Sequence, residues 1–191
     1  MRTLISITAA LIAAAPAAAL EPQSSLNVAQ AQPRRNQAPD VIFVPTPQEV
    51  VDEMLRLANV RKGDVLYDLG SGDGRIPVTA AKKFGVRAVG IDIDPERIQE
   101  ANENAKKNGV TNLVKFRNED LFQADFHEAT VVTLYLLPDL NVKLMPRLME
   151  QLRPGSRIVS HQFDMGKWRP DKKVELSGRT IYLWTIPAKK P

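Results

Sequence analysis

Cysteine is absent from this chain of 191 residues, and histidine occurs only twice, as His127 and His161. Without cysteine the chain has no disulfide, no thiolate metal ligand and no cysteine nucleophile. Two histidines are too few for a histidine-rich metal cluster, so we expect no metal site. The formal net charge is only +4 and no run of five like charges occurs, so the composition does not indicate nucleic-acid binding.

Long hydrophobic runs are also scarce, and the one near the start, residues 4–15, is too short to span a membrane comfortably. It follows Met1 and Arg2 and precedes the small residues 17–19, an order that predicts a secretory signal peptide over residues 1–20. Cleavage is expected after Ala19, with a second small-residue site at residues 29–31. An uncleaved membrane anchor is the alternative, so the protein is expected to be exported to the periplasm or held near a membrane.

Residues 21–40 are rich in Gln, Pro, Ala, Asn and Ser and have no apolar period, which predicts a disordered linker. Residues 41–191 then form one domain of ordinary globular composition, with 43% hydrophobic and 25% charged residues in the whole chain.

The most informative segment of this domain is residues 68–74, which read Asp-Leu-Gly-Ser-Gly-Asp-Gly after the apolar run 65–67. A buried strand is expected to end here and a helix to begin near Arg75. Alternate glycines let the backbone take positive φ values and let a ligand approach the main chain. The following helix would direct free N–H groups and the positive end of its dipole at that ligand.

The spacing of these glycines weakens a dinucleotide interpretation, because Arg75 stands where the Gly-x-Gly-x-x-Gly fingerprint needs its third glycine. Asp68, two residues before Gly70, suits a cationic amino group better than a phosphate. Asp92 ends the next expected strand about twenty residues on, where a carboxylate can accept both ribose hydroxyls. The pattern therefore indicates a ligand that contains a nucleoside and carries charges of both signs.

Strands and helices alternate along the rest of the domain, which predicts an α/β fold with helices on both faces of a mainly parallel sheet. Thr46, Pro47 and Glu49 form a candidate capping box that would start a first helix at Pro47. Pro146 is expected to kink a later helix or to start a new one. Expected strands cover 65–69, 87–91, 114–117, 131–136 and 157–161, and a closing hairpin covers 174–176 and 180–186.

These features resemble the class I, seven-stranded S-adenosylmethionine-dependent methyltransferases, a Rossmann-like fold with a C-terminal antiparallel hairpin. In that family Asp-x-Gly-x-Gly-x-Gly ends the first strand, and acidic residues after the second and third strands hold the ribose and the adenine. Residues 68–74, Asp92 and Asp120 match those places, and residues 152–159 resemble the turn before the fifth strand. The run 68–76 is most similar to the group of lysine methyltransferases that act on the ATP synthase c-subunit.

The resemblance implies S-adenosylmethionine as cofactor and no metal. Glu119 is the alternative to Asp120 as the adenine ligand. The residues predicted to bind the cofactor are Thr46, Asp68, Gly70, Ser71, Gly72, Gly74, Asp92, Ile93, Asp120 and Leu121.

Tyr135, at the end of the fourth expected strand, is the candidate catalytic residue, because its position faces the transferred methyl group; a core tyrosine is the alternative. The chain lacks an Asn-Pro-Pro-Tyr or Asp-Pro-Pro-Tyr element, which disfavours methyltransferases of amides and exocyclic amines. We expect methyl transfer to a lysine of a protein or, as the alternative, to a small molecule. A non-catalytic nucleoside-binding module is a further alternative, because an exported enzyme would lack an obvious supply of the cofactor.

Overall fold

The computed structural model describes residues 43–188, and the signal peptide and linker expected over 1–40 lie outside them. The described elements run in the order α1 (Gln48–Leu57), β1 (Val65–Leu69), α2 (Arg75–Phe84), β2 (Arg87–Asp92), α3 (Pro95–Lys107), β3 (Val114–Asn118), β4 (Val131–Leu134), α4 (Pro138–Gln151), β5 (Arg157–His161), β6 (Lys172–Leu176) and β7 (Arg179–Thr185). No helix within residues 43–188 is long and apolar enough to cross a membrane.

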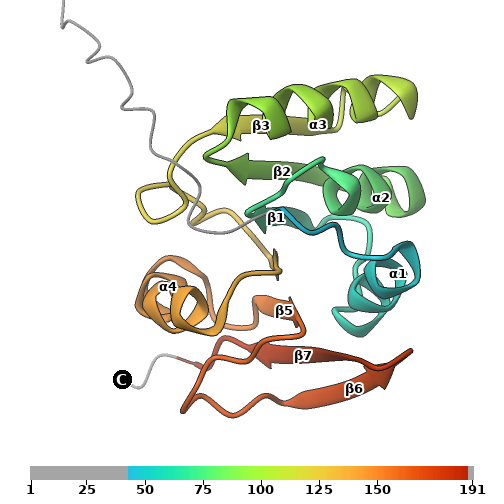
Figure 1. Cartoon of the computed structure of the whole chain (residues 1–191). Coiled ribbons are helices and arrows are strands. Elements are labelled where there is room, and N and C mark those ends of the chain that lie inside the picture. Colours follow the sequence, from blue (N-terminus) through green and yellow to red (C-terminus); the bar gives the residue numbers. More distant parts are fainter. Residues whose placement is uncertain (1–42, 189–191) are drawn as a thin grey trace, which may run out of the picture. The chain divides into compact units, whose positions relative to one another are not determined.

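The strands form a single seven-stranded sheet in the order β3-β2-β1-β4-β5-β7-β6 (Figure 1). Strands β1 to β5 pair in parallel, whereas β7 runs antiparallel to β5 and to β6. The chain moves outward from β1 to β3 and then returns to place β4 on the other side of β1. This reversal leaves a crevice at the carboxyl ends of β1 and β4, the position at which open α/β sheets bind ligands. The expected fold and its antiparallel hairpin are confirmed.

Helices cover both faces of the sheet: α1, α2 and α3 lie on one side and α4 on the other (Figure 1). Two hydrophobic clusters fill the spaces between these layers. One contains Met54 and Leu55 of α1 with Leu66 of β1, and the other contains Leu144 and Leu148 of α4. Strand β1 is buried along its whole length because it contributes side chains to both clusters.

The capping box expected at the first helix is absent. Helix α1 begins at Gln48, Pro47 is its N-cap residue, and no side chain caps its end. The Thr46 hydroxyl instead lies 3.2 Å from Nδ1 of His161 on β5. The expected cap is wrong because His161, which is distant in the sequence, contacts the Thr46 hydroxyl group that would have capped the helix.

Two other boundaries differ from the sequence expectation. Strand β4 ends at Leu134, two residues early, so Tyr135 lies just beyond the strand. Pro146 lies inside one helix, α4, and does not start a new segment. By contrast, Asp94 caps α3 as expected, since its carboxylate accepts a hydrogen bond from the Glu96 N–H at 2.8 Å.

Candidate functional site

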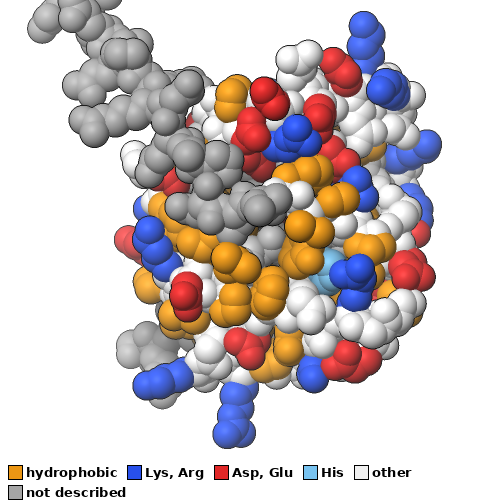
Figure 2. Space-filling view, viewed as in Figure 1, with side chains coloured by type: hydrophobic (Ala, Val, Ile, Leu, Met, Phe, Trp, Pro, Cys, Tyr) orange, Lys and Arg blue, Asp and Glu red, His pale blue; other side chains and the backbone are white. Residues whose placement is uncertain are grey.

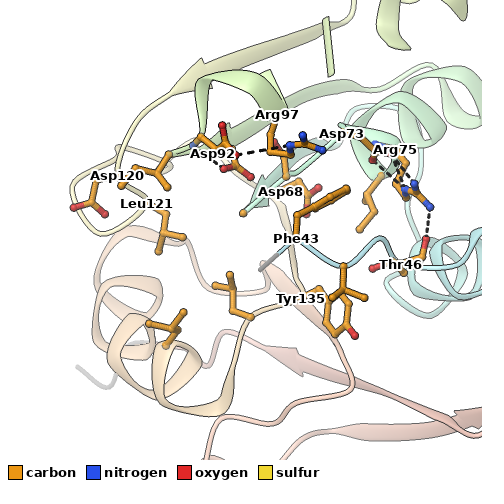
Figure 3. A pocket seen from close by; sticks show the side chains of 18 of the residues that line it. Phe43, Thr46, Asp68, Asp73, Arg75, Asp92, Arg97, Asp120, Leu121 and Tyr135 are labelled. Atoms are coloured by element: carbon orange, nitrogen blue, oxygen red, sulfur yellow. Dashed lines mark hydrogen bonds and ion pairs between the residues drawn. The ribbon is translucent and has the colours of Figure 1, made fainter. Parts of the chain in front are cut away.

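A cavity of about 500 Å³ opens at the carboxyl ends of the central strands (Figure 3). Its size falls in the range of cavities that hold small-molecule ligands. Most residues predicted from the sequence line this cavity, namely Thr46, Asp68, Gly70, Ser71, Asp92, Ile93, Asp120, Leu121 and Tyr135. The remaining two, Gly72 and Gly74, do not line it. The fold therefore brings together residues separated by up to 89 positions, as expected if they bind one ligand.

The loop after β1 is held by the second strand. The N–H groups of Gly70 and Ser71 both donate to the Ile91 carbonyl, at 2.8 and 2.9 Å. Ser71 lines the cavity, but its hydroxyl is buried and has no hydrogen-bond partner within residues 43–188. The hydroxyl lies beside Gly90 of β2, where an added Cβ would lie 2.7 Å from Ser71 Oγ, so it is not open to a ligand in the cavity.

Asp92 is fixed by two backbone groups. Its carboxylate accepts from the Gly72 N–H at 2.8 Å and from the Asp94 N–H at 3.0 Å. Burial raises the pKa of Asp92, and these backbone hydrogen bonds oppose the rise. The N–H of Gly72 already donates to Asp92 and is not free to bind a ligand, so Gly72 contributes to the site by orienting Asp92. A carboxylate oriented in this way retains lone pairs for the two hydroxyls of a ribose.

Gly74 has a packing role. It takes a left-handed conformation with φ of 72° immediately before α2. A Cβ atom at Gly74 would lie 2.4 Å from the Phe116 ring and 2.8 Å from the Ala101 methyl group. Gly74 was expected to let a ligand approach the backbone. The side chains of Phe116 and Ala101 fill that space instead, so ligand approach does not explain this glycine.

Asp68 is the most strongly perturbed group of the cavity. Its side chain is buried, and it accepts a hydrogen bond from the Thr133 hydroxyl at 2.7 Å across the β1–β4 pair. Burial raises the pKa of Asp68 to about 8, and the carboxylates of Asp92 and Asp73 add to the rise, whereas the Thr133 hydrogen bond opposes it. A cation bound beside Asp68 would favour its charged form and lower this pKa.

This raised pKa predicts that a ligand with an ammonium group binds more tightly as the pH rises. Below pH 8 the free Asp68 carboxyl holds a proton, which must leave when the ammonium group binds. For S-adenosylhomocysteine we expect the affinity to increase by up to about tenfold per pH unit from pH 6 to 8 and then to level off. Calorimetric titration in buffers of different ionisation enthalpy measures both affinity and proton release. A pH dependence that persists unchanged in Asp68→Asn would contradict the assignment.

The structure distinguishes the two candidate adenine ligands. Asp120 lines the cavity, and one carboxylate oxygen accepts from the Phe122 N–H at 2.8 Å. Glu119 is outside the lining and forms an ion pair with Arg117 at 2.5 Å. Asp120 is therefore the carboxylate available to a ligand. Leu121 and Phe122 beside it supply apolar surface suited to a flat ring.

Arg75 fastens the segment before α1 to the glycine loop. Its guanidinium group pairs with Asp73 at 2.6 Å and donates to the Thr46 carbonyl at 2.9 Å. Arg75 stands where a dinucleotide fingerprint would have its third glycine. Its side chain joins the glycine loop to the segment before α1. Arg75 also lines the cavity, a position that was not predicted from the sequence.

Sequence reasoning missed the contribution of Phe43. Its ring packs on Gly72, where an added Cβ would lie 2.2 Å from a ring carbon, and the Arg97 guanidinium group lies 5.0 Å from the ring centre. In Figure 3 the Phe43 side chain lies near Asp68 and Arg97 inside the cavity. No signal marks this residue, because it follows a stretch with linker-like composition.

Tyr135 lines the same cavity from the loop after β4, and its ring centre lies 4.0 Å from that of His161. From the sequence, His161 could be a base or a buried or strand-end histidine. The structure buries it completely between Tyr135 and Thr46.

Known proteins resemble this chain in sequence and in structure. The family model of the ANTKMT methyltransferase domain matches residues 68–172. A protein-lysine N-methyltransferase of Saccharolobus islandicus is 46% identical over 153 residues, which cover 78% of this chain and 95% of that protein. The lysine N-methyltransferase of Mus musculus that acts on the ATP synthase c-subunit is 30% identical, and the match covers 78% of this chain and 59% of the mouse protein.

Among solved structures, an RNA methyltransferase from Salinibacter ruber in complex with S-adenosyl-L-homocysteine is 61% identical. Its TM-score is 0.76, and the match covers 78% of this chain and 97% of that one. The cavity fits this type of ligand, since it combines the oriented Asp92 carboxylate with the buried Asp68 carboxyl. S-adenosylmethionine is therefore the cofactor, as predicted.

Proposed function

Because the chain belongs to the ANTKMT methyltransferase domain family and is an S-adenosylmethionine-dependent methyltransferase, we propose that it methylates the ε-amino group of a protein lysine. The observation that carries this proposal is the 46% identical protein-lysine N-methyltransferase, of which the match covers 95%. The match spans only 59% of the mouse enzyme that acts on the ATP synthase c-subunit, so that acceptor is not transferred to this chain.

Methyl transfer needs little acid or base catalysis from the protein. The lysine nitrogen attacks the methyl carbon in line, a C–N bond forms, and the electron pair of the breaking C–S bond goes to sulfur. The methylated nitrogen carries the positive charge as an ammonium ion, so the one proton released in the reaction is the proton that lysine loses before the attack. The protein's main contribution is to align donor and acceptor. Lysine must first lose a proton, because its ordinary pKa of about 10.4 keeps it charged near neutral pH.

The surroundings of the cavity favour a protein acceptor. Phe43 and Val44 line it and are 39% and 55% exposed, and Leu137, directly after the lining residue Leu136, is 47% exposed. Figure 2 shows hydrophobic side chains gathered over this face. Exposed apolar groups around a pocket suit contact with a protein surface. A polyanion would be bound mainly by clustered Lys and Arg.

RNA is the second candidate acceptor, since the 61% identical solved structure is described as an RNA methyltransferase. The sequence predicted no nucleic-acid partner from its modest charge. The two acceptors are distinguished by digesting the labelled product.

The test uses the full chain, S-adenosylmethionine labelled in the methyl group, and cell extract treated beforehand to remove endogenous methylation. We expect the label in material that proteinase K degrades and ribonuclease does not, and methyllysine after acid hydrolysis. Asp92→Ala serves as the control that should lack transfer. Label released by ribonuclease would favour the RNA acceptor, label in low-molecular-weight material would favour a small-molecule enzyme, and no label would favour a binding module.

We also propose that residues 1–20 direct export or anchor the domain near a membrane. The support is the order of charge, apolar stretch and small residues. Cell fractionation combined with mass spectrometry of the purified chain tests this. A mature chain that begins after Ala19 and is found outside the cytosol is expected for export, and a full-length chain in the membrane fraction for anchoring. A full-length chain found only in the cytosol would contradict both.

A further inference from the structure

Three aromatic rings meet at the carboxyl ends of β4 and β5, next to the cofactor cavity. The Tyr135 ring centre lies 4.0 Å from that of His161 and 6.1 Å from that of Phe163, with which it stacks. Tyr135 lines the cavity, whereas His161 and Phe163 stand behind it. The cluster thus forms an aromatic wall on the side of the cavity away from Asp92 and Asp120.

A strained turn holds this wall. The Phe163 N–H donates to the His161 carbonyl at 2.9 Å, which closes a three-residue turn around Gln162, whose φ is +68°. Such turns are rare and strained for residues other than glycine. Two hydrogen bonds with Thr180 hold Gln162: its N–H donates at 2.7 Å and its side-chain oxygen accepts at 3.3 Å. Strain kept by its surroundings is a feature of functional sites.

His161 has one nitrogen without a partner. The imidazole is fully buried, its Nδ1 lies 3.2 Å from the Thr46 hydroxyl, and its Nε2 has no hydrogen bond within residues 43–188. Burial lowers the pKa of His161 to about 4, with a further contribution from Arg179 on β7, so the ring is neutral at physiological pH. The tautomer with its hydrogen on Nδ1 donates that hydrogen to Thr46 and leaves a lone pair on Nε2.

A neutral imidazole suits a neutral amine. It cannot serve as a strong base, but its lone pair can accept an N–H from an uncharged amine and leave the amine's own lone pair free to attack. Rings around the amine exclude water and disfavour the ammonium form. Both Thr46 and Tyr135 line the cofactor cavity, so the imidazole is separated from that cavity by single side chains.

We propose that Tyr135, His161 and Phe163 form the binding site of the acceptor lysine, and that Nε2 of His161 accepts a hydrogen bond from its neutral amine. This inference rests on the proposed lysine methylation. Tyr135 is only partly buried and packs against the face of the imidazole, and Nε2 of His161 is buried, so the amine must displace part of this cluster to reach Nε2. His161 and Phe163 then align the amine, and Asp68 and Asp92 hold the cofactor on the opposite side.

Imidazole nitrogen NMR tests this directly, because the chain has only two histidines and His127 is exposed. With full-length protein saturated with S-adenosylhomocysteine, we expect His161 to remain neutral from pH 6 to 9 with its hydrogen on Nδ1. Addition of n-butylamine at high pH, as the probe for a neutral lysine side chain, should shift the Nε2 resonance of His161 and leave His127 unchanged. A hydrogen on Nε2, or an unshifted resonance at saturating amine, would overturn the inference.

A variant supplies the functional readout. His161→Phe keeps a ring in the cluster and removes both nitrogens, so we expect S-adenosylhomocysteine affinity within about twofold of wild type and methyl transfer to protein reduced at least tenfold. Unchanged transfer in His161→Phe, with methyllysine still formed, would refute the role of His161 and leave lysine methylation standing. Absence of methyllysine from the wild-type reaction would instead refute the proposed function, whatever the NMR result.

Discussion

Replacing Asp92 with alanine is expected to weaken S-adenosylhomocysteine binding at least tenfold, which corresponds to a loss of about 1.4 kcal/mol or more. The carboxylate is oriented by the N–H groups of Gly72 and Asp94 and faces the cavity, where it is placed to accept the ribose hydroxyls. Removing it loses charge-assisted hydrogen bonds to the ligand, each worth about 1.5–3 kcal/mol, and leaves the Gly72 N–H without its acceptor. Calorimetric titration gives the affinity.

Two further variants make this result interpretable. Asp125→Ala removes an exposed carboxylate outside the cavity and should leave the affinity unchanged. Asp92→Asn keeps the shape and one acceptor oxygen, so its affinity should lie between wild type and Asp92→Ala. Binding by Asp92→Ala within twofold of wild type would mean that the ribose is held elsewhere.

The second large effect concerns stability. Gly74→Ala is expected to lower the free energy of unfolding by about 2 to 5 kcal/mol, the sum of a left-handed backbone cost of about 1–2 kcal/mol and an overpacking cost of about 1–3 kcal/mol. The added methyl group would meet the Phe116 ring and Ala101 at distances well below contact. Urea unfolding monitored by tryptophan fluorescence measures the change.

Gly85 provides a matched control at the other end of the same helix. Its φ is +65°, close to the +72° of Gly74, yet a Cβ there would have no neighbour within 4 Å. Gly85→Ala should therefore cost only the backbone part, about 1–2 kcal/mol. Equal losses in the two variants would show that Gly74 is needed for its conformation alone and not for the packing of α2 against α3.

The features that could be predicted from the sequence are those fixed by short segments. The apolar run 65–67 with its glycine loop, and Asp94 before Pro95, each specify a strand end or a helix start by local chemistry. Because parallel strands place their carboxyl ends on one edge, the residues after β1, β2 and β3 could be assigned to one site. Asp68, Asp92 and Asp120 indeed line one cavity.

The features that could not be predicted depend on contacts between distant segments. The sequence offered the Thr46 hydroxyl a local role in a capping box with Glu49. In the structure this hydroxyl contacts His161, 115 residues away. Phe43 carries no motif, and its position against Gly72 follows from how Arg75 holds the preceding segment. The absence of a hydrogen-bond partner at Nε2 of His161 within the described residues is likewise a consequence of burial between Thr46 and Tyr135, which no spacing in the sequence reveals.

The most direct test of this account is a crystal structure of the chain with S-adenosylhomocysteine. We predict the ligand across the carboxyl ends of β1, β2 and β3, with its ribose hydroxyls on Asp92, its adenine beside Asp120 and Leu121, and its amino group near Asp68. Its sulfur should face Tyr135, from which side the acceptor enters. A ligand bound elsewhere, or a cavity that stays empty at saturating ligand, would contradict the central claim.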